Sequence, residues 1–243
     1  MGLLDWFSKD AKLERATERW GKKLMQKYMQ TAERKRAIEA LTDIGTPEAI
    51  SALLRRFQYR TDATIVDEDE KQQVYAAVVG LGDDSVTPLV TYISNELSLY
   101  WPAKALRAIV GDAETARHII TALDGIEDSF GTNQQRREQL VDSLRGLAHE
   151  ETVYQKLLAL MQDEDEEVVI RAIDGLSARD DDAVAKAVIP MLLVDGTSAR
   201  VRTMAMELMT EQNWQVPKEH KKALREILPS AYFIDDTGVV RRK

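Results

Sequence analysis

The sequence contains no cysteine and only three histidines among its 243 residues. The missing thiols exclude disulfide bonds, zinc sites built on thiolates and cysteine nucleophiles. No apolar run approaches the ~20 residues that a membrane-spanning helix needs. The stretch from Met1 to Phe7 is too short and too acidic for a signal peptide, and Trp6 stands where a myristoylation signal has Ser or Thr. These absences predict a cytoplasmic protein without a membrane span.

Positive charge is scarce in the middle of the chain. The net charge is −8, but residues 1–60 carry 13 Lys and Arg against 8 Asp and Glu, whereas residues 61–199 carry 11 against 27. Residues 200–243 are basic again, with 9 against 6. A nucleic-acid groove needs clustered cations to displace counterions, so this distribution predicts that nucleic acid is not the partner. Most of the carboxylates open predicted helices, where they complement the helix dipole.

A short pattern, small–aliphatic–any–small–aliphatic, recurs six times. Its first residues lie 28 to 40 positions apart, a spacing typical of stacked helical repeats. Small residues let stacked helices approach closely, and the adjacent aliphatic residue fills the neighbour's groove. The six copies are Ala37–Leu41, Ala77–Leu81, Ala105–Ile109, Ser143–Leu147, Ala172–Leu176 and, loosely, Ala205–Met209.

Each repeat is predicted to hold two helices. The signature marks the first helix, and a polar turn separates it from a second helix with its own apolar stripe. The first repeat carries clear signals for the boundary between its two helices. Gly45 predicts the end of the first helix, Thr46 the N-cap of the second, and Pro47 its first turn. Two connections, 58–69 and 124–133, are longer than a tight turn, and long loops in compact repeats often carry function.

Both ends of the chain depart from the repeat pattern. Residues 12–29 predict an amphipathic helix with Leu13, Ala16, Trp20, Leu24 and Tyr28 on its apolar face. Residues 1–30 are expected to cap the first repeat; contact with a membrane surface is the alternative, because basic residues follow an apolar tip. Residues 229–243 predict a short β-hairpin. The expected organisation is therefore a cap (1–30), a repeat domain (31–228) and a hairpin (229–243).

The six signatures resemble those of the HEAT-repeat superfamily, in particular bacterial proteins with short lyase-type HEAT-like repeats. The resemblance implies an all-α solenoid, a right-handed superhelix of about six antiparallel helix pairs. It implies a non-catalytic adaptor or scaffold that binds a protein partner through the solenoid surface. An accessory protein of bilin-lyase type and a nucleic-acid-binding HEAT-like protein are the alternatives, because this fold serves several functions.

No group of residues indicates catalysis, a metal or a cofactor. The segment Asp236-Thr237-Gly238 matches the loop of aspartic proteases, but that mechanism needs two such carboxylates and the motif occurs once. A single His149-Glu150 pair does not supply a di-iron site of the kind that one HEAT-type hydroxylase carries. We therefore predict no enzyme activity, no metal and no cofactor.

Partner binding is the best-supported class of function. In HEAT-type solenoids the second helices line the concave side, which here would present cations to an acidic peptide or helix of the partner. The most aromatic stretch is Tyr100-Trp101-Pro102, and Trp and Tyr are enriched in interface hot spots. The alternative is that Trp101 fills the core. The candidate partner-binding residues are Arg55, Tyr59, Tyr92, Tyr100, Trp101, Arg117, Lys156, Lys221 and Arg225.

Overall fold

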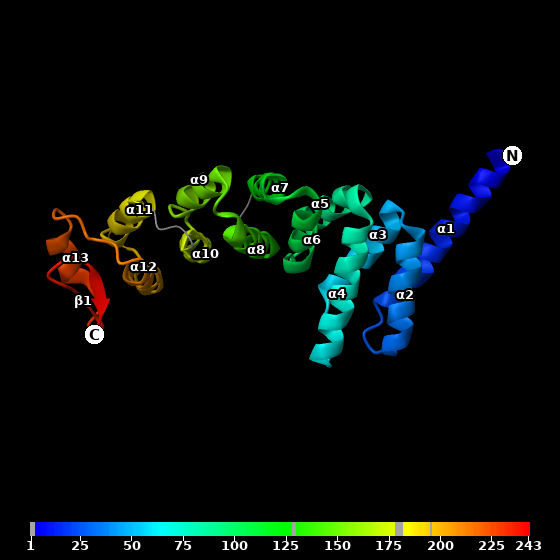
Figure 1. Ribbon diagram of the computed structural model, residues 1–243, viewed down its shortest axis with the longest axis horizontal. Helices are drawn as coiled ribbons and strands as arrows, with labels where there is room; N and C mark the ends of the chain where they lie inside the picture. The colour runs from blue at the N-terminus through cyan, green and yellow to red at the C-terminus, as the bar shows by residue number, and fades with distance from the viewer. Residues whose placement is uncertain (1–2, 128–129, 178–181, 195) are drawn as a thin grey trace. The chain divides into compact units, whose positions relative to one another are not determined.

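The chain folds into two compact units, residues 1–127 (unit 1) and residues 128–243 (unit 2). The structure is a computed structural model that describes residues 3–127, 130–177, 182–194 and 196–243. These residues form thirteen α-helices and one two-stranded sheet (Figure 1). The prediction of a mostly helical protein with a short C-terminal hairpin is confirmed. None of the described helices combines the length and the apolar character that crossing a membrane requires.

Unit 1 consists of two layers of helices. The first helices of the repeats, α2, α4 and α6, contact one another in succession, and so do the second helices, α3, α5 and α7. Helix α1 packs against both α2 and α3. The elements are α1 (Leu3–Leu24), α2 (Thr31–Ile44), α3 (Pro47–Leu54), η1 (Arg55–Gln58), α4 (Thr64–Gly80), η2 (Gly82–Ser85), α5 (Val86–Asn95), α6 (Tyr100–Val110) and α7 (Asp112–Asp124).

Unit 2 repeats the succession of first helices. Helix α10 contacts α8 on one side and α12 on the other, while α9 packs against α10 and α11 against α12. The elements are α8 (Thr132–Leu144), η3 (Arg145–Leu147), α9 (Glu151–Leu160), α10 (Glu166–Leu176), α11 (Asp182–Leu192), α12 (Ala199–Glu211), α13 (Lys221–Ile227), β1 (Tyr232–Ile234) and β2 (Val240–Arg242).

Each signature lies on a first helix, as the sequence predicts, in its C-terminal half, and Ser143–Leu147 continues from α8 into η3. Their first small residue is completely buried in four of the six copies, at Ala37, Ala105, Ala172 and Ala205. The second small residue was expected to allow close approach too, but it is exposed in three copies. A Cβ atom added at Gly80 would meet nothing within 4 Å, whereas at Gly175 it would lie 3.1 Å from Leu157. Close packing therefore depends on the first small residue and on Gly175.

The turn between α2 and α3 follows its sequence signals. Gly45 has a φ of 64°, the left-handed conformation that ends many helices. The hydroxyl of Thr46 accepts a hydrogen bond from the backbone N–H of Ala49 at 3.3 Å, and Pro47 occupies the first position of α3. The cap satisfies one of the unpaired N–H groups at the start of α3.

The predicted N-terminal helix differs from the observed one at both ends. Helix α1 begins at Leu3 and ends at Leu24, so Tyr28 lies outside it and is 88% exposed. After the helix ends, the backbone carbonyls of Lys27 and Met29 accept hydrogen bonds from the guanidinium of Arg34. Arg34 thus holds the segment between α1 and α2 against the start of α2.

The predicted connection 58–69 is shorter than expected, because α4 begins at Thr64. Residue Ala63 precedes the helix and offers no side-chain cap, so the sequence carries no start signal there. The second predicted connection, 124–133, agrees more closely with the structure, because α7 ends at Asp124 and α8 begins at Thr132. Residues 128 and 129 of that connection lie outside the described residues.

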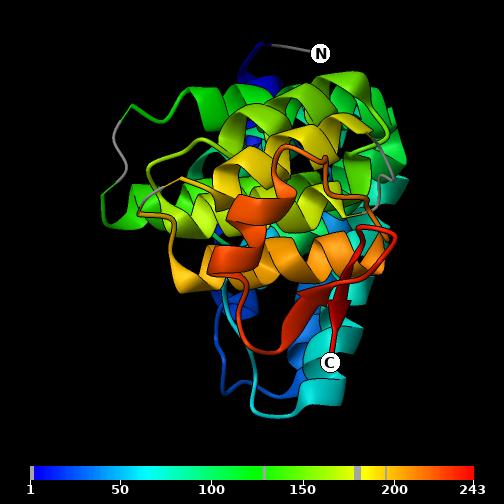
Figure 2. The same cartoon turned by 90° about the vertical axis from the view of Figure 1, so that its left-hand side faces the viewer.

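The C-terminal hairpin pairs antiparallel, with Ile234 opposite Val240. Strand β2 contacts α12 and strand β1 contacts α13, and Figure 2 shows the hairpin (red) beside these helices. The segment Asp236-Thr237-Gly238 forms the turn, where Gly238 has a φ of 93°. This Asp-Thr-Gly sequence therefore serves as a hairpin turn.

Candidate functional site

The candidate site begins at η1, where three successive side chains point in different directions. A 3-10 helix has about three residues per turn, so neighbouring side chains diverge by about 120°. Arg55 is exposed, whereas Arg56 is 0% exposed and Phe57 is 2% exposed. Arg56 enters a buried group of charges, and Phe57 enters a group of aromatic rings. The short η1 helix thus joins two features of unit 1.

The first feature is an ion network of five buried side chains. The Arg34 guanidinium of α2 donates to both carboxylate oxygens of Glu70 on α4, at 2.9 and 3.0 Å. The Arg56 guanidinium donates to the same Glu70 at 2.9 Å and to Asp67 at 2.8 Å. The Lys71 ammonium lies 2.7 Å from the second oxygen of Asp67. The ion network is therefore Arg34, Arg56, Asp67, Glu70 and Lys71.

Removing these charges from water is costly, so each needs partners of opposite sign or backbone dipoles. The network holds three cations and two carboxylates, and backbone carbonyls compensate the excess positive charge. Arg34 donates to the carbonyl oxygen of Lys27 at 3.2 Å, and Arg56 donates to that of Tyr59 at 3.1 Å. Burial by itself would raise the pKa of Asp67, but hydrogen bonds from Lys71, Arg56 and a backbone N–H outweigh it and lower this pKa to about 2.

The ion network fixes the first turns of α4. Asp67, Glu70 and Lys71 all lie in the N-terminal half of this 17-residue helix. Their partners come from α2 and η1, so the network ties α4 to the preceding repeat. In Figure 1 the N-terminal part of α4 (cyan) projects beyond α6. The network thus holds this part of α4 to α2 and η1.

The second feature is a group of aromatic rings at the junction of α4, α6 and η1. The indole of Trp101 stacks on Phe57 with 6.3 Å between ring centroids and an interplanar angle of 9°. Tyr75 of α4 lies 5.6 Å from the indole at a tilt of 55°, and Tyr100 contacts it edge-on at 5.4 Å. Such pairs stabilise by ~0.5–1.5 kcal/mol each beyond the burial of their area.

One cation sits against these rings. The Lys104 ammonium lies 4.9 Å from the ring of Trp101, 5.1 Å from that of Tyr75 and 5.9 Å from that of Tyr100. These distances are in the range of cation–π attraction. Phe57 is buried, Tyr75 and Trp101 are half-buried, and Tyr100 is 68% exposed. We call this group the aromatic cluster: Phe57, Tyr75, Tyr100, Trp101 and Lys104.

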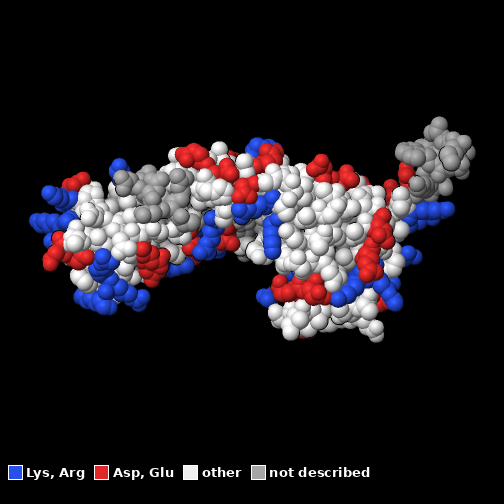
Figure 3. All heavy atoms as spheres, viewed as in Figure 1, with Lys and Arg blue, Asp and Glu red and all other residues white. Residues whose placement is uncertain are grey.

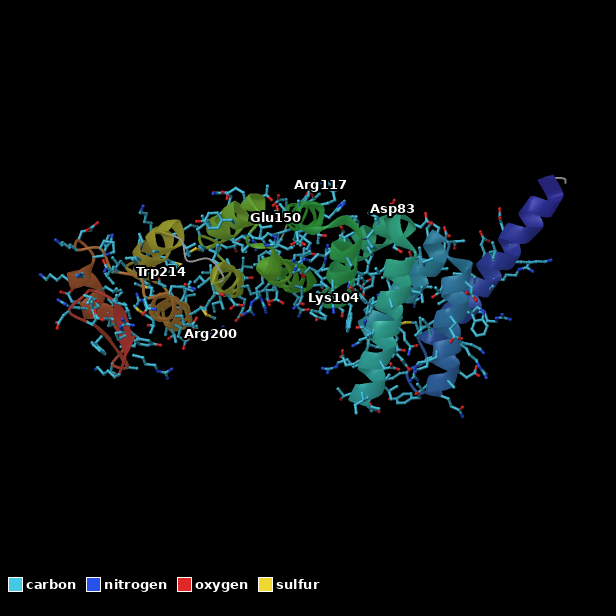
Figure 4. The ribbon with its side chains drawn as sticks, in the orientation of Figure 1. Asp83, Lys104, Arg117, Glu150, Arg200 and Trp214 are labelled. Atoms are coloured by element: carbon cyan, nitrogen blue, oxygen red, sulfur yellow. The ribbon has the colours of Figure 1, made fainter. Side chains whose placement is uncertain are left out.

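One face of unit 1 carries few charges. In Figure 3 the face of unit 1 over the C-terminal part of α4 and the adjacent helices is largely white, and a band of acidic and basic side chains borders it below. Lys104, in the middle of α6, lies toward the lower side of unit 1 in Figure 4, and Arg117 of α7 lies on the upper side. The two layers of helices thus present different surfaces.

The predicted residues of unit 1 divide between these surfaces. Tyr100 and Trp101 belong to the aromatic cluster. The Tyr59 hydroxyl donates to the Leu24 carbonyl at 2.6 Å, and the Arg56 guanidinium lies 4.3 Å from its ring, so Tyr59 has a role inside the fold. Arg117 is exposed on α7 and forms an ion pair with Glu114.

Arg55 and Tyr92 lie together on the layer of second helices. Both line a groove of about 300 Å³ between α3 and α5. Tyr92 is only 7% exposed, and its buried hydroxyl has no hydrogen-bond partner among the described residues. Burial, and secondarily the charge of Glu96, raises the pKa of this phenol. Arg55 presents its charge at the edge of this groove, on a different layer from Lys104.

The remaining predicted residues belong to unit 2. Lys156 is half-buried on α9. Lys221 begins α13 and Arg225 follows one turn later on the same short helix. In the described part of the chain, no three His, Asp or Glu side chains converge as metal ligands would.

Two parts of this site were missed by sequence reasoning. Tyr75 and Lys104 were not predicted as functional, although Lys104 follows Tyr100 by one helical turn and thus shares its face. The ion network was not predicted at all. The available signal was the spacing of Asp67, Glu70 and Lys71, which places three charges on one face of a helix.

Comparison with known protein families finds no family model that matches the chain, and comparison with curated proteins finds no match either. The side chains and their geometry therefore carry the functional argument.

Proposed function

We propose that the chain is a HEAT-like α-solenoid with a non-catalytic function: it acts as a cytoplasmic adaptor or scaffold and binds a protein partner through the aromatic cluster of unit 1. The solenoid is supported by the six signatures, which all begin on first helices, and by the contacts between successive first helices within each unit. Stacked helix pairs bury a continuous apolar seam and leave long surfaces for recognition.

The observation that carries the binding proposal is the exposure of the aromatic cluster. Tyr100 leaves 68% of its surface in water although it contacts the half-buried Trp101, which stacks on the buried Phe57. Exposed Tyr and half-buried Trp with a buried support are the composition of interface hot spots. The rings hold one another in place, so little side-chain entropy remains to be lost on binding.

Co-purification from cells tests this function. Wild-type protein and Tyr100→Ala are compared as baits, with bound proteins quantified by mass spectrometry. Because hot-spot truncations cost ~2 kcal/mol or more, we expect recovery of a specific partner to fall about tenfold or more with Tyr100→Ala. The helical circular dichroism should not change, since the side chain is largely exposed.

Tyr28→Ala is the matched control. Tyr28 is also an exposed tyrosine of unit 1 with a lysine over its ring, Lys27 at 5.6 Å, but it lies outside the aromatic cluster. It should retain every partner. Equal recovery with all three baits, or equal loss with both variants, would contradict the proposed function.

A further inference from the structure

We propose that the partner presents a carboxylate side chain next to an apolar one, with the carboxylate paired to Lys104 and the apolar side chain packed on Tyr100 and Trp101. This inference rests on the proposed function and specifies the chemistry of its partner. It starts from the one charged member of the aromatic cluster.

Lys104 lacks an ion-pair partner in the described part of the chain. Its side chain is exposed, and it is not among the cations that lie within 4.0 Å of a carboxylate there. The other cation of α6 is engaged, because Arg107 holds Asp112 at 2.5 and 2.6 Å. Among the residues that the structure describes, aromatic faces are the partners of Lys104, so its ammonium N–H groups that point away from the rings remain available to an anion.

The sequence around Lys104 favours an anionic partner. Helix α6, Tyr100–Val110, contains two basic residues and no acidic one. Arg107 is neutralised by Asp112, which leaves Lys104 as the uncompensated charge of the helix. A basic partner would meet like charge here, whereas a carboxylate would complete the ion pair.

The rings make this ion pair stronger than an ordinary surface pair. An exposed lysine loses side-chain entropy when it is fixed, which cancels much of the Coulomb gain. Three rings already restrain Lys104, so this loss is smaller. The rings also exclude water from one side of the ammonium, which lowers the local dielectric and strengthens attraction to a carboxylate.

A protein segment fits the site better than a nucleic acid. A phosphate backbone brings several charges and gains affinity by meeting several cations. The aromatic cluster offers one, and the stripe beyond it on α6 carries the exposed Ala108 and the neutralised Arg107. One cation beside exposed ring edges matches one carboxylate beside one apolar side chain.

The test uses short fluorescent peptides and the full-length protein. The first peptide carries Glu-Leu-Glu-Phe between Gly and Ser residues; the second replaces Glu with Gln, and the third replaces Glu with Lys. The chain has four tryptophans and therefore four indole N–H signals by NMR. We expect the Glu peptide to shift the signal of Trp101, which Trp101→Phe assigns, and to leave that of Trp214 in unit 2 unchanged.

Charge reversal then identifies the cation. With Lys104→Glu, affinity for the Glu peptide should fall about tenfold, and affinity for the Lys peptide should rise. With Lys104→Met, affinity for the Glu peptide should fall, but affinity for the Lys peptide should not rise. Lys22→Glu is the matched control on α1, where Lys22 is exposed and pairs with Glu18 at 2.6 Å. It should bind the peptides as the wild type does.

Three results would overturn the inference: equal binding of the Glu and Lys peptides, an unshifted Trp101 signal, or unchanged affinity in Lys104→Glu. A shift of the Trp101 signal by a single-stranded oligonucleotide and by none of the peptides would also overturn it. If Tyr100→Ala loses its cellular partner while Lys104→Glu binds the Glu peptide normally, the inference fails and the proposed function stands.

Discussion

Unit 1 and unit 2 use the same kind of element and bury different side chains. Every charged side chain that is buried among the described residues lies in unit 1, and all five belong to the ion network. In unit 2, ion pairs such as Arg171 with Glu138 stay 28% and 17% exposed. The core of unit 2 instead buries four methionines, Met161, Met191, Met206 and Met209, whereas unit 1 buries none among its described residues.

The two kinds of core differ in how strictly they fix the arrangement of their helices. Methionine is flexible and fills irregular gaps, so a methionine-rich core tolerates small shifts between helices. A buried carboxylate between two guanidinium groups tolerates little, because a misplaced partner leaves an unpaired charge. Unit 1 is thus held in one arrangement by directional contacts at the place where the aromatic cluster is built.

The largest expected effect comes from breaking the ion network. Glu70→Gln keeps the shape of the side chain but leaves Arg34 and Arg56 without their shared carboxylate. Breaking a buried ion pair costs ~3–5 kcal/mol, so we expect unit 1 to lose about 3 kcal/mol of unfolding free energy. Hydrogen exchange in increasing urea, read from peptides of α4 and of α10, measures the two units in one sample.

Glu167→Gln in unit 2 serves as the control for this substitution. Its partner Arg200 is 64% exposed, so the loss should stay below ~1 kcal/mol. If the two variants lose the same stability, the distinction between a buried network and surface pairs is wrong.

Acid should weaken unit 1 through Asp67. The pKa of this carboxyl is lowered to about 2 in the folded chain, against ~3.9 in an unfolded one. A lowered folded pKa gives stability that is complete above ~pH 4 and is lost as the pH falls toward 2, here ~2 kcal/mol. Urea unfolding at about pH 5 and about pH 2.5 should show this loss for α4. Asp67→Asn should be less stable at neutral pH and less sensitive to acid; an unchanged acid sensitivity would assign it to other groups.

The smallest expected change in stability comes from replacing two glycines, Gly80 and Gly175, that both occupy the fourth position of the signature. Gly80→Ala should stabilise unit 1 by ~0.5–1 kcal/mol, because alanine restricts the unfolded chain and its Cβ would meet nothing within 4 Å. Gly175→Ala should bring no gain in unit 2, since its Cβ would lie 3.1 and 3.3 Å from Leu157. Thermal or urea unfolding of both variants checks the sign, and stabilisation in both would show that Leu157 moves aside freely.

The layout of the helices could be predicted because it depends on local periodicity. The small residue and its aliphatic neighbour recur in the C-terminal half of each first helix. Backbone preferences of Gly45, Thr46 and Pro47 mark one helix boundary. The start of α4 could not be predicted, because Ala63 provides no cap and Thr64 resembles a loop residue.

The candidate site could be predicted only where one segment carries it. Tyr100 and Trp101 are adjacent in sequence and were identified. The ion network joins Arg34 and Arg56 to Glu70 across 36 and 14 positions, and no local pattern links residues that far apart. Tyr59 was predicted as a partner-binding residue on the connection 58–69, but its hydroxyl donates to the Leu24 carbonyl at the end of α1, a contact that only tertiary structure reveals.

The geometry of η1 restricts how this protein can change over evolution. Its side chains point in three directions: Arg55 toward solvent, Arg56 into the ion network and Phe57 into the aromatic cluster. Each side chain suits only its own surroundings. Inserting a single residue before η1 would turn its side chains by about a third of a revolution and place Arg56 where Phe57 stacks on the indole of Trp101, whereas deleting one would place Gln58 there. Length variation should therefore be tolerated at other turns of the chain and selected against at this one.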